Sequence, residues 1–124
     1  MNLNQITISV SNIEKSIEFY EKIGLQLIVK APHYARFVCP DGQSTFSLHI
    51  ATEPICNTHT SIYFEENNLD DKVRELQAKG IKFDELPIDK PWLWRESRLR
   101  DPDNNLSVLY FGGENRLNPP WRIK

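Results

Sequence analysis

The feature of this sequence that most restricts its fold is an internal repeat. Gly80 follows Gly24 by 56 residues, and each glycine ends a stretch in which apolar residues recur at helical spacing. The same shift places Ile81 on Leu25. The first predicted helix carries Ile13, Ile17, Tyr20 and Ile23, and the second carries Leu69, Val73 and Leu76. Matched helices and matched ends in the same order favour a tandem duplication.

Strands and turns repeat as well. Residues 5–10 alternate polar and apolar side chains, which is the period of a half-buried strand. Ser11, with Glu14 three residues later, is expected to cap the first helix. The turn at 40–43 matches the turn at 102–105 at a shift of 62 residues, so about six residues were gained between the copies, most of them expected in 87–94.

The repeat predicts the fold class and the domain organisation. The 124 residues fit one α+β domain with module one at 1–54, module two at 57–112 and a C-terminal arm at 113–124. Each module alone would leave one face of a small sheet bare. The helices are expected to cover the apolar faces, and the opposite faces carry polar side chains: Gln5, Thr7, Ser9, Ser47, His49, His59, Ser61 and Tyr63. Polar inner faces predict a wet, curved cleft between the modules that accepts a small molecule.

Composition excludes several function classes. Hydrophobic residues make up 40% and charged residues 26%, with a formal net charge of −2 and no basic run, so nucleic acid is not an expected partner. No apolar stretch approaches the roughly 20 residues that span a bilayer. Residues 1–5 lack the features of a signal peptide, and the two cysteines have no CxxC spacing. A cytoplasmic protein with reduced thiols and no membrane partner is expected.

Two sequence motifs carry a family resemblance. They read Ile8-x-Val10-x-x-Ile13-x-x-Ser16-Ile17-x-Phe19-Tyr20, followed by Gly24-Leu25, and Leu76-x-x-x-Gly80, followed by Asp101-Pro102-Asp103-Asn104-Asn105. At this separation the chain resembles the vicinal oxygen chelate superfamily, which includes glyoxalase I, extradiol dioxygenases, fosfomycin-resistance enzymes and bleomycin-resistance proteins. The resemblance implies paired βαβββ modules in an open, barrel-like arrangement and a homodimer.

Metal-dependent relatives in that superfamily commonly use a histidine in the first strand, a histidine at the start of the second module and a glutamate in the last strand of each module. By position these ligands fall on Gln5, on Ser61, near Ser47 and on Val108, none of which is a usual ligand. The resemblance is therefore nearest to non-metal, bleomycin-resistance-like members, and no cofactor is expected.

A relocated metal site remains an alternative. His49 and His59 share the polar side by strand parity, and Glu96 could join them to hold zinc, nickel or manganese. Against this alternative, His59 would belong to an exposed loop and His49 would be a polar wall residue.

Residues 91–98 combine tryptophans with charged side chains within a short segment. This segment resembles the W-x-x-R-E stretch that precedes the second hairpin in bleomycin-resistance-like members. Parity places Trp92, Trp94, Glu96 and Arg98 on the side opposite Leu99, which is expected in the core. Aromatic rings offer stacking area to a flat ligand, and the charged groups offer polar contacts. An ordinary Arg–Glu pair beside packing tryptophans is the competing interpretation.

Two functions follow as hypotheses. The first is a protein that binds or sequesters a small, flat organic ligand through Gln5, Thr7, His49, Ser61, Tyr63, Trp92, Trp94, Glu96 and Arg98. The second is a glyoxalase-like lyase or isomerase with a divalent metal at the relocated histidine site. In the arm, two glycines and two prolines present Trp121 as an anchor for its own domain, a dimer mate or the cleft mouth.

Overall fold

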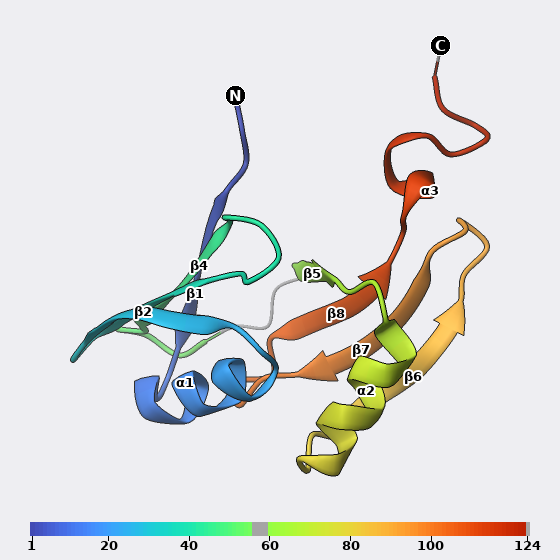
Figure 1. The fold of residues 1–124 in the computed structure, drawn as a ribbon. Coiled ribbons are helices and arrows are strands. Elements are labelled where there is room, and N and C mark those ends of the chain that lie inside the picture. Colours follow the sequence, from blue (N-terminus) through green and yellow to red (C-terminus); the bar gives the residue numbers. More distant parts are fainter. Residues whose placement is uncertain (56–59, 124) are drawn as a thin grey trace. The chain divides into compact units, whose positions relative to one another are not determined.

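The computed structural model describes residues 1–55 and 60–123, and within them the chain forms two compact units. Each unit contains a four-stranded sheet and a helix of ten residues (Figure 1). The units are Met1–Thr58 with Asp101–Asn104, and His59–Arg100 with Asn105–Lys124. No helix in the described ranges is long and apolar enough to cross a membrane.

The first unit contains one mixed sheet and the helix α1. Its elements are β1 (Gln5–Val10), α1 (Ile13–Lys22), β2 (Gln26–Ala31), β3 (Tyr34–Val38) and β4 (Thr45–Ile50). The strand order is β1-β4-β3-β2, with β1 parallel to β4 and the other neighbours antiparallel.

The second unit repeats this topology. Its elements are β5 (Ser61–Glu65), α2 (Leu69–Ala78), β6 (Phe83–Asp89), β7 (Arg95–Arg100), β8 (Leu106–Phe111) and the short α3 (Glu114–Leu117). The order β5-β8-β7-β6, with β5 parallel to β8, matches the first sheet strand for strand. The predicted α+β class and the predicted duplication are confirmed.

Both long helices end in the same hydrogen-bonded motif. Gly24 has φ 115° and Gly80 has φ 90°, a left-handed conformation that glycine adopts without a Cβ clash. The N–H of Leu25 donates to the Tyr20 carbonyl at 3.0 Å, and each glycine N–H donates to the carbonyl three residues earlier at 3.0 Å. The equivalent bond from Ile81 in the second unit is also 3.0 Å long. The glycines therefore stop the helices and turn the chain into the next strand, as the sequence predicts.

The start of α1 differs from the prediction. Asn12, not Ser11, is the N-cap, because Asn12 has an extended backbone and its Oδ1 accepts from the Lys15 N–H at 3.0 Å. The Ser11 N–H instead donates to Asp103 Oδ2 at 3.0 Å. In the second unit Asn68 is the cap, and its side chain makes no capping hydrogen bond.

The hairpin turns match, and the gained residues lie where the sequence places them. Gly42 (φ 118°) and Asn104 (φ 66°), which correspond at a shift of 62, both have positive φ. Two residues join β2 to β3, whereas residues 90–94 join β6 to β7. That longer turn is closed by a hydrogen bond of 2.8 Å between the Lys90 N–H and the Trp94 carbonyl. The extra length therefore carries Trp92 and Trp94.

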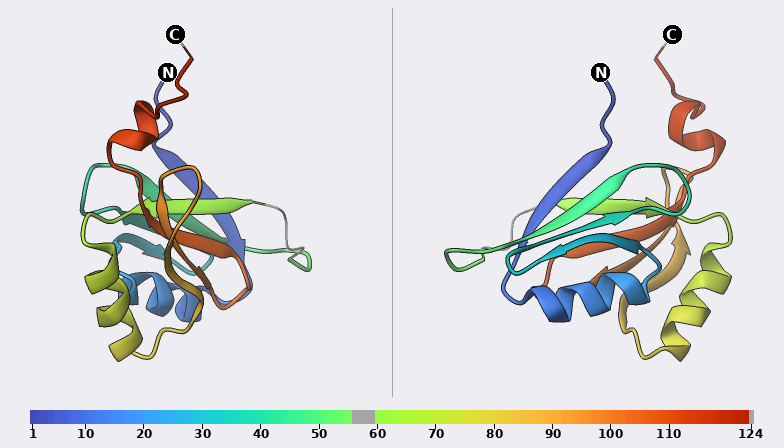
Figure 2. Two further views of the ribbon diagram at one scale, coloured as in Figure 1. Left: turned by 90° about the vertical axis from the view of Figure 1, so that its right-hand side faces the viewer. Right: turned by 60° about the vertical axis from the view of Figure 1, so that its left-hand side comes forward.

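Each sheet has one apolar face, which its helix covers (Figure 2). In the first unit Tyr20 of α1 packs on Phe46, with ring centroids 4.8 Å apart, and Phe37 and Leu48 on the same face are fully buried. In the second unit α2 buries Leu69, Val73 and Leu76. The opposite face of each sheet, here called the helix-free face, carries those of the polar residues predicted from strand parity that lie in the described strands.

Candidate functional site

The helix-free face of the second sheet gathers most of the predicted binding residues. In the strand register Tyr63 pairs with Val108, which pairs with Arg98, and Glu96 pairs with Tyr110. Residues paired across neighbouring strands share a face. The expectation that Glu96 and Arg98 lie opposite Leu99 is therefore confirmed, and Leu99 itself is fully buried.

The other side of β7 faces the helix. Arg95 donates from Nε and Nη2 to the two carboxylate oxygens of Asp70 at 2.8 and 3.0 Å, and from Nη1 to Asp89 at 3.0 Å. The hydrogen bonds from Arg95 hold the pKa of Asp70 below its usual range. Arg95 therefore connects β7 to the start of α2.

Three aromatic rings form a cluster on the helix-free face. Trp94 lies against Tyr110, with ring centroids 4.8 Å apart and planes at 35°, and Tyr63 meets both rings edge-on at 5.9 and 5.3 Å. Tyr110 is buried, and this burial raises the pKa of its hydroxyl. Tyr63, by contrast, is 41% exposed. We call Tyr63, Trp94 and Tyr110 the aromatic cluster. It places the partly exposed ring of Tyr63 beside the buried ring of Tyr110, and exposed aromatic surface of this kind suits packing against a flat molecule.

Beside the aromatic cluster lies a buried carboxylate. Glu96 is fully buried, and its Oε2 accepts a hydrogen bond of 2.6 Å from Trp92 Nε1. Within the described ranges its Oε1 has no hydrogen-bond partner, and the Arg98 Nη2 lies 3.6 Å away. A buried carboxylate oxygen without a hydrogen bond is costly, and because the Glu96 side chain has no exposed surface, a ligand reaches this oxygen only by displacing a side chain that covers it.

Arg98 lies between two carboxylates. Its Nε is 3.8 Å from Glu85 Oε1 and its Nη2 is 3.6 Å from Glu96 Oε1. Lys90 Nζ also contacts Glu85 Oε1, at 2.7 Å. The four side chains balance in charge, which favours a neutral or hydrogen-bond-donating ligand over a strongly charged one.

The C-terminal arm begins at this face. Glu65 Oε2 accepts from the N–H groups of Gly112 and Gly113, both at 3.0 Å. Trp94 Nε1 donates to the Asn115 carbonyl at 3.2 Å, which fixes the orientation of the indole. Trp121, expected to be an anchor, is 58% exposed, so only the first part of the arm is held by these contacts.

In the first unit the helix-free face holds a hydrogen-bonded network. Gln5 Nε2 donates to Ser47 Oγ at 2.9 Å and to Thr7 Oγ1 at 3.0 Å. Ser47 Oγ lies 2.6 Å from the Tyr34 hydroxyl, which accepts from Arg36 Nε at 2.9 Å. Sequence reasoning missed Tyr34 and Arg36, although their alternation along β3 places them on the polar side.

The remaining predicted positions lie apart from these networks. His49 is exposed and pairs with Tyr34 across the strands. Ser61 is exposed at the start of β5. His59 lies outside the described residues. Within residues 1–55 and 60–123, no group of three or more His, Cys, Asp or Glu side chains is arranged to hold a metal ion.

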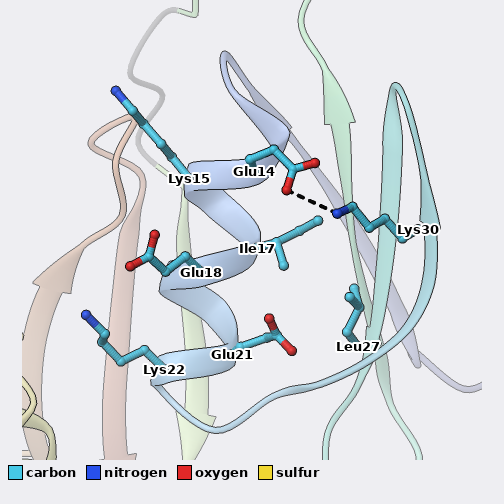
Figure 3. A pocket seen from close by; sticks show the side chains of 8 residues that line it. All are labelled: Glu14, Lys15, Ile17, Glu18, Glu21, Lys22, Leu27 and Lys30. Carbon is cyan, nitrogen blue, oxygen red and sulfur yellow. Dashed lines mark hydrogen bonds and ion pairs between the residues drawn. The ribbon is translucent and has the colours of Figure 1, made fainter.

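A separate groove of about 700 Å³ lies between α1 and β2 (Figure 3). Lys30 and Glu14 form an ion pair across this groove, with 3.1 Å between Lys30 Nζ and Glu14 Oε2. Both side chains are more than half exposed. The acidic and basic residues that line this groove from α1 are typical of a solvated helix surface. This groove offers no convergent polar site.

Residues 2–109 match the family described as the Glyoxalase/Bleomycin resistance protein/Dioxygenase superfamily. The chain belongs to this superfamily. The match extends over both modules, which agrees with the resemblance inferred from the two motifs. The positions that correspond to the usual metal ligands, Gln5, Ser47, Ser61 and Val108, all lie on helix-free faces of the two sheets.

Two curated relatives are similar along most of the chain. The protein "Uncharacterized protein YraH" of Bacillus subtilis (strain 168) is 28% identical, over 89% of this chain and 98% of the relative. The "Trivalent organoarsenical cleaving enzyme" of Bacillus sp. (strain MD1) is 27% identical, over 97% of this chain and 81% of the relative.

Solved structures of the superfamily share the fold. A glyoxalase/bleomycin resistance protein/dioxygenase from Nocardioides has a TM-score of 0.78 at 20% identity, covering all of this chain and 90% of its own. Lactoylglutathione lyase from Agrobacterium tumefaciens has a TM-score of 0.73 at 18% identity, covering 90% of this chain and 93% of its own. At these identities the likeness concerns the fold.

Proposed function

We propose that this superfamily member binds a small, flat organic molecule on the helix-free face of its second module. The observation that carries the proposal is the aromatic cluster, in which Tyr63 is 41% exposed, beside Glu96, whose buried Oε1 has no hydrogen-bond partner in the described ranges. A flat ligand stacks on Tyr63 and Trp94, displaces a side chain that covers Glu96, and donates an N–H or O–H to its Oε1.

The proposal includes binding without the metal site of many relatives. Gln5, Ser47, Ser61 and Val108 lack the imidazole and carboxylate groups that hold a catalytic divalent ion. The chemistry supplied by the second module is therefore stacking and hydrogen bonding, which suits sequestration of a ligand.

A ligand screen tests the proposal. Flat heteroaromatic compounds with and without an N–H or O–H donor are titrated into the protein and followed by ligand-observed NMR. Donor-bearing compounds should bind, and Glu96→Gln should weaken them about tenfold, as expected for a lost charge-assisted hydrogen bond. Glu18→Gln on the exposed surface of α1 removes the same charge and should change nothing. Equal binding to both variants would refute the role of Glu96.

A second candidate is an enzyme of lyase or isomerase type. It is favoured by the relative named as a trivalent organoarsenical cleaving enzyme, and it would require a bound divalent ion. Elemental analysis of the purified protein after mild dialysis separates the candidates. Stoichiometric zinc, nickel, manganese or iron would favour the enzyme.

The assembly and location form the last part of the proposal. The superfamily resemblance implies a homodimer, and the composition fits the cytoplasm. Analytical ultracentrifugation at several concentrations measures the assembly. A monomer at all of them would contradict the dimer.

A further inference from the structure

We propose a second binding site, on the helix-free face of the first module, which takes the oxyanion group of a small molecule, a carboxylate or a phosphate. Its residues are Tyr34, Arg36, Ser47 and Gln5, joined by hydrogen bonds of 2.6–2.9 Å. This site shares no named residue with the one proposed above, so the two proposals are tested separately.

The first argument is charge. Arg36 is exposed, and within residues 1–55 and 60–123 no carboxylate lies within ion-pair distance of its guanidinium. None of the four strands of the first sheet contains Asp or Glu. The other basic strand residue, Lys30, is paired with Glu14. The sheet therefore presents one guanidinium whose charge no strand residue balances, and its planar fork matches carboxylate and phosphate oxygens.

The second argument is the count of hydroxyl protons. Ser47 Oγ and the Tyr34 hydroxyl have two protons, and the 2.6 Å contact between them uses one. Ser47 is fully buried and already accepts from Gln5, whereas Tyr34 is partly exposed. When Ser47 donates to Tyr34, the free proton is on Tyr34, whose side chain is the more exposed of the two. The cluster then presents an O–H beside a guanidinium, both of which are donors.

The third argument is how the phenol is held. Tyr34 accepts from Arg36 Nε at 2.9 Å, and the Arg36 guanidinium carbon lies 5.4 Å from the Tyr34 ring centre. The hydrogen bond with Ser47, with a contribution from Arg36, lowers the pKa of Tyr34. The other ionisable group facing Tyr34 from the neighbouring strands is His49, its partner on β4. A phenol with a lowered pKa is a strong hydrogen-bond donor to an anion.

The probes are benzoate, acetate and inorganic phosphate, titrated at constant ionic strength into protein labelled with carbon-13 on the tyrosine rings. A bound anion disfavours the phenolate, so it should raise the pKa of Tyr34 measured from the ring carbon shift. Tyr34→Phe identifies the signal among the four tyrosines. Binding of the carboxylates alone, or of phosphate alone, identifies the natural oxyanion, and either result supports the site.

Matched arginine variants complete the test. Arg36→Ala should weaken binding of the bound probe at least about tenfold, because a charge-assisted hydrogen bond is lost. Arg74→Ala removes the same charge from the surface of α2 and should leave binding unchanged. The proposal is overturned if none of the probes moves the Tyr34 titration, or if both variants bind equally well.

Discussion

The Tyr20 hydroxyl donates a hydrogen bond of 2.7 Å to Asp101 Oδ2, although the two residues are 81 positions apart. Tyr20 belongs to the helix motif and Asp101 to the hairpin motif that together suggest the superfamily, and segment 101–104 packs as part of the first unit. The Asp101 Oδ1 also accepts from the Asp103 N–H at 2.9 Å, so the Asp101 side chain stabilises the turn that follows it. The two motifs are therefore in direct contact.

Tyr20→Phe should destabilise the protein. Tyr20 and Asp101 are 1% and 5% exposed. The variant therefore removes a buried donor and leaves the Asp101 Oδ2 with one hydrogen bond fewer. The expected loss is about 1–3 kcal/mol in the free energy of unfolding, measured by urea denaturation. Tyr63→Phe removes a hydroxyl from a 41% exposed side chain and serves as the control. Equal stability of the two variants would mean that the Tyr20 bond contributes nothing.

Gly80→Ala should destabilise the end of α2 through the backbone alone. Gly80 has φ 90°, and a Cβ added there would meet no atom within 4 Å, so no steric contact competes with the conformational effect. The expected cost is about 1–2 kcal/mol. Gly80→Asn should cost less, because asparagine tolerates the left-handed region better. Thermal melts of the pair measure the difference, and an alanine variant as stable as the asparagine variant would contradict the prediction.

The Asp70–Arg95 pair should give a pH-dependent contribution to stability. The folded-state pKa of Asp70 is lowered, so the contribution is present above the unfolded pKa of about 4 and is lost as the pH falls through the folded pKa. Because the side chains of Asp70 and Arg95 are 46% and 36% exposed, Asp70→Asn should cost about 1 kcal/mol or less at neutral pH.

The matched control for this pair is Asp71→Asn, which removes a carboxylate from the same helix turn, where it pairs with Arg74 on the surface. Urea denaturation of the three proteins from neutral pH to pH 3 should show the Asp70 deficit shrinking with acid. A deficit that stays constant over this range would rule out the ion pair as its cause.

Much of the fold could be predicted because the pattern of each helix, strand and turn occurs twice in the sequence, so that one copy supports the prediction made from the other. Gly24 and Gly80 end both helices, and the positive φ of Gly42 and Asn104 confirms the turn alignment. The cap of α1 was predicted one residue too early, because Ser11 and Asn12 are both favourable caps in sequence. Only the backbone geometry distinguishes them.

The candidate sites were less accessible to sequence reasoning. Strand parity placed Trp94, Glu96 and Arg98 on one face, but parity does not show which side chains lie in hydrogen-bonding distance. Tyr34 and Arg36 meet Ser47 only because β3 pairs with β4 in the observed register. The contact of Glu65 with Gly112 joins positions 47 residues apart, and no local pattern signals it.

Trp94→Ala should weaken ligand binding more than it weakens the fold. Trp94 is only partly buried, although it contacts Tyr110 and donates to the Asn115 carbonyl. Losing one stacking ring should cost about 1–3 kcal/mol of binding free energy for a planar ligand. If Trp94 is instead mainly a core residue, truncation should cost about 3–5 kcal/mol of stability.

Thermal melts and titration of a ligand found in the screen, carried out on the same variant, separate these outcomes. Trp121→Ala is the control, since that indole is 58% exposed on the arm and should affect neither measurement strongly. Trp94→Phe keeps a ring but loses the indole N–H, so it should retain most of the stacking while loosening the contact with Asn115. A large drop in melting temperature with unchanged affinity in Trp94→Ala would end the role of Trp94 in the site, because a residue that a ligand stacks on cannot be removed without loss of affinity.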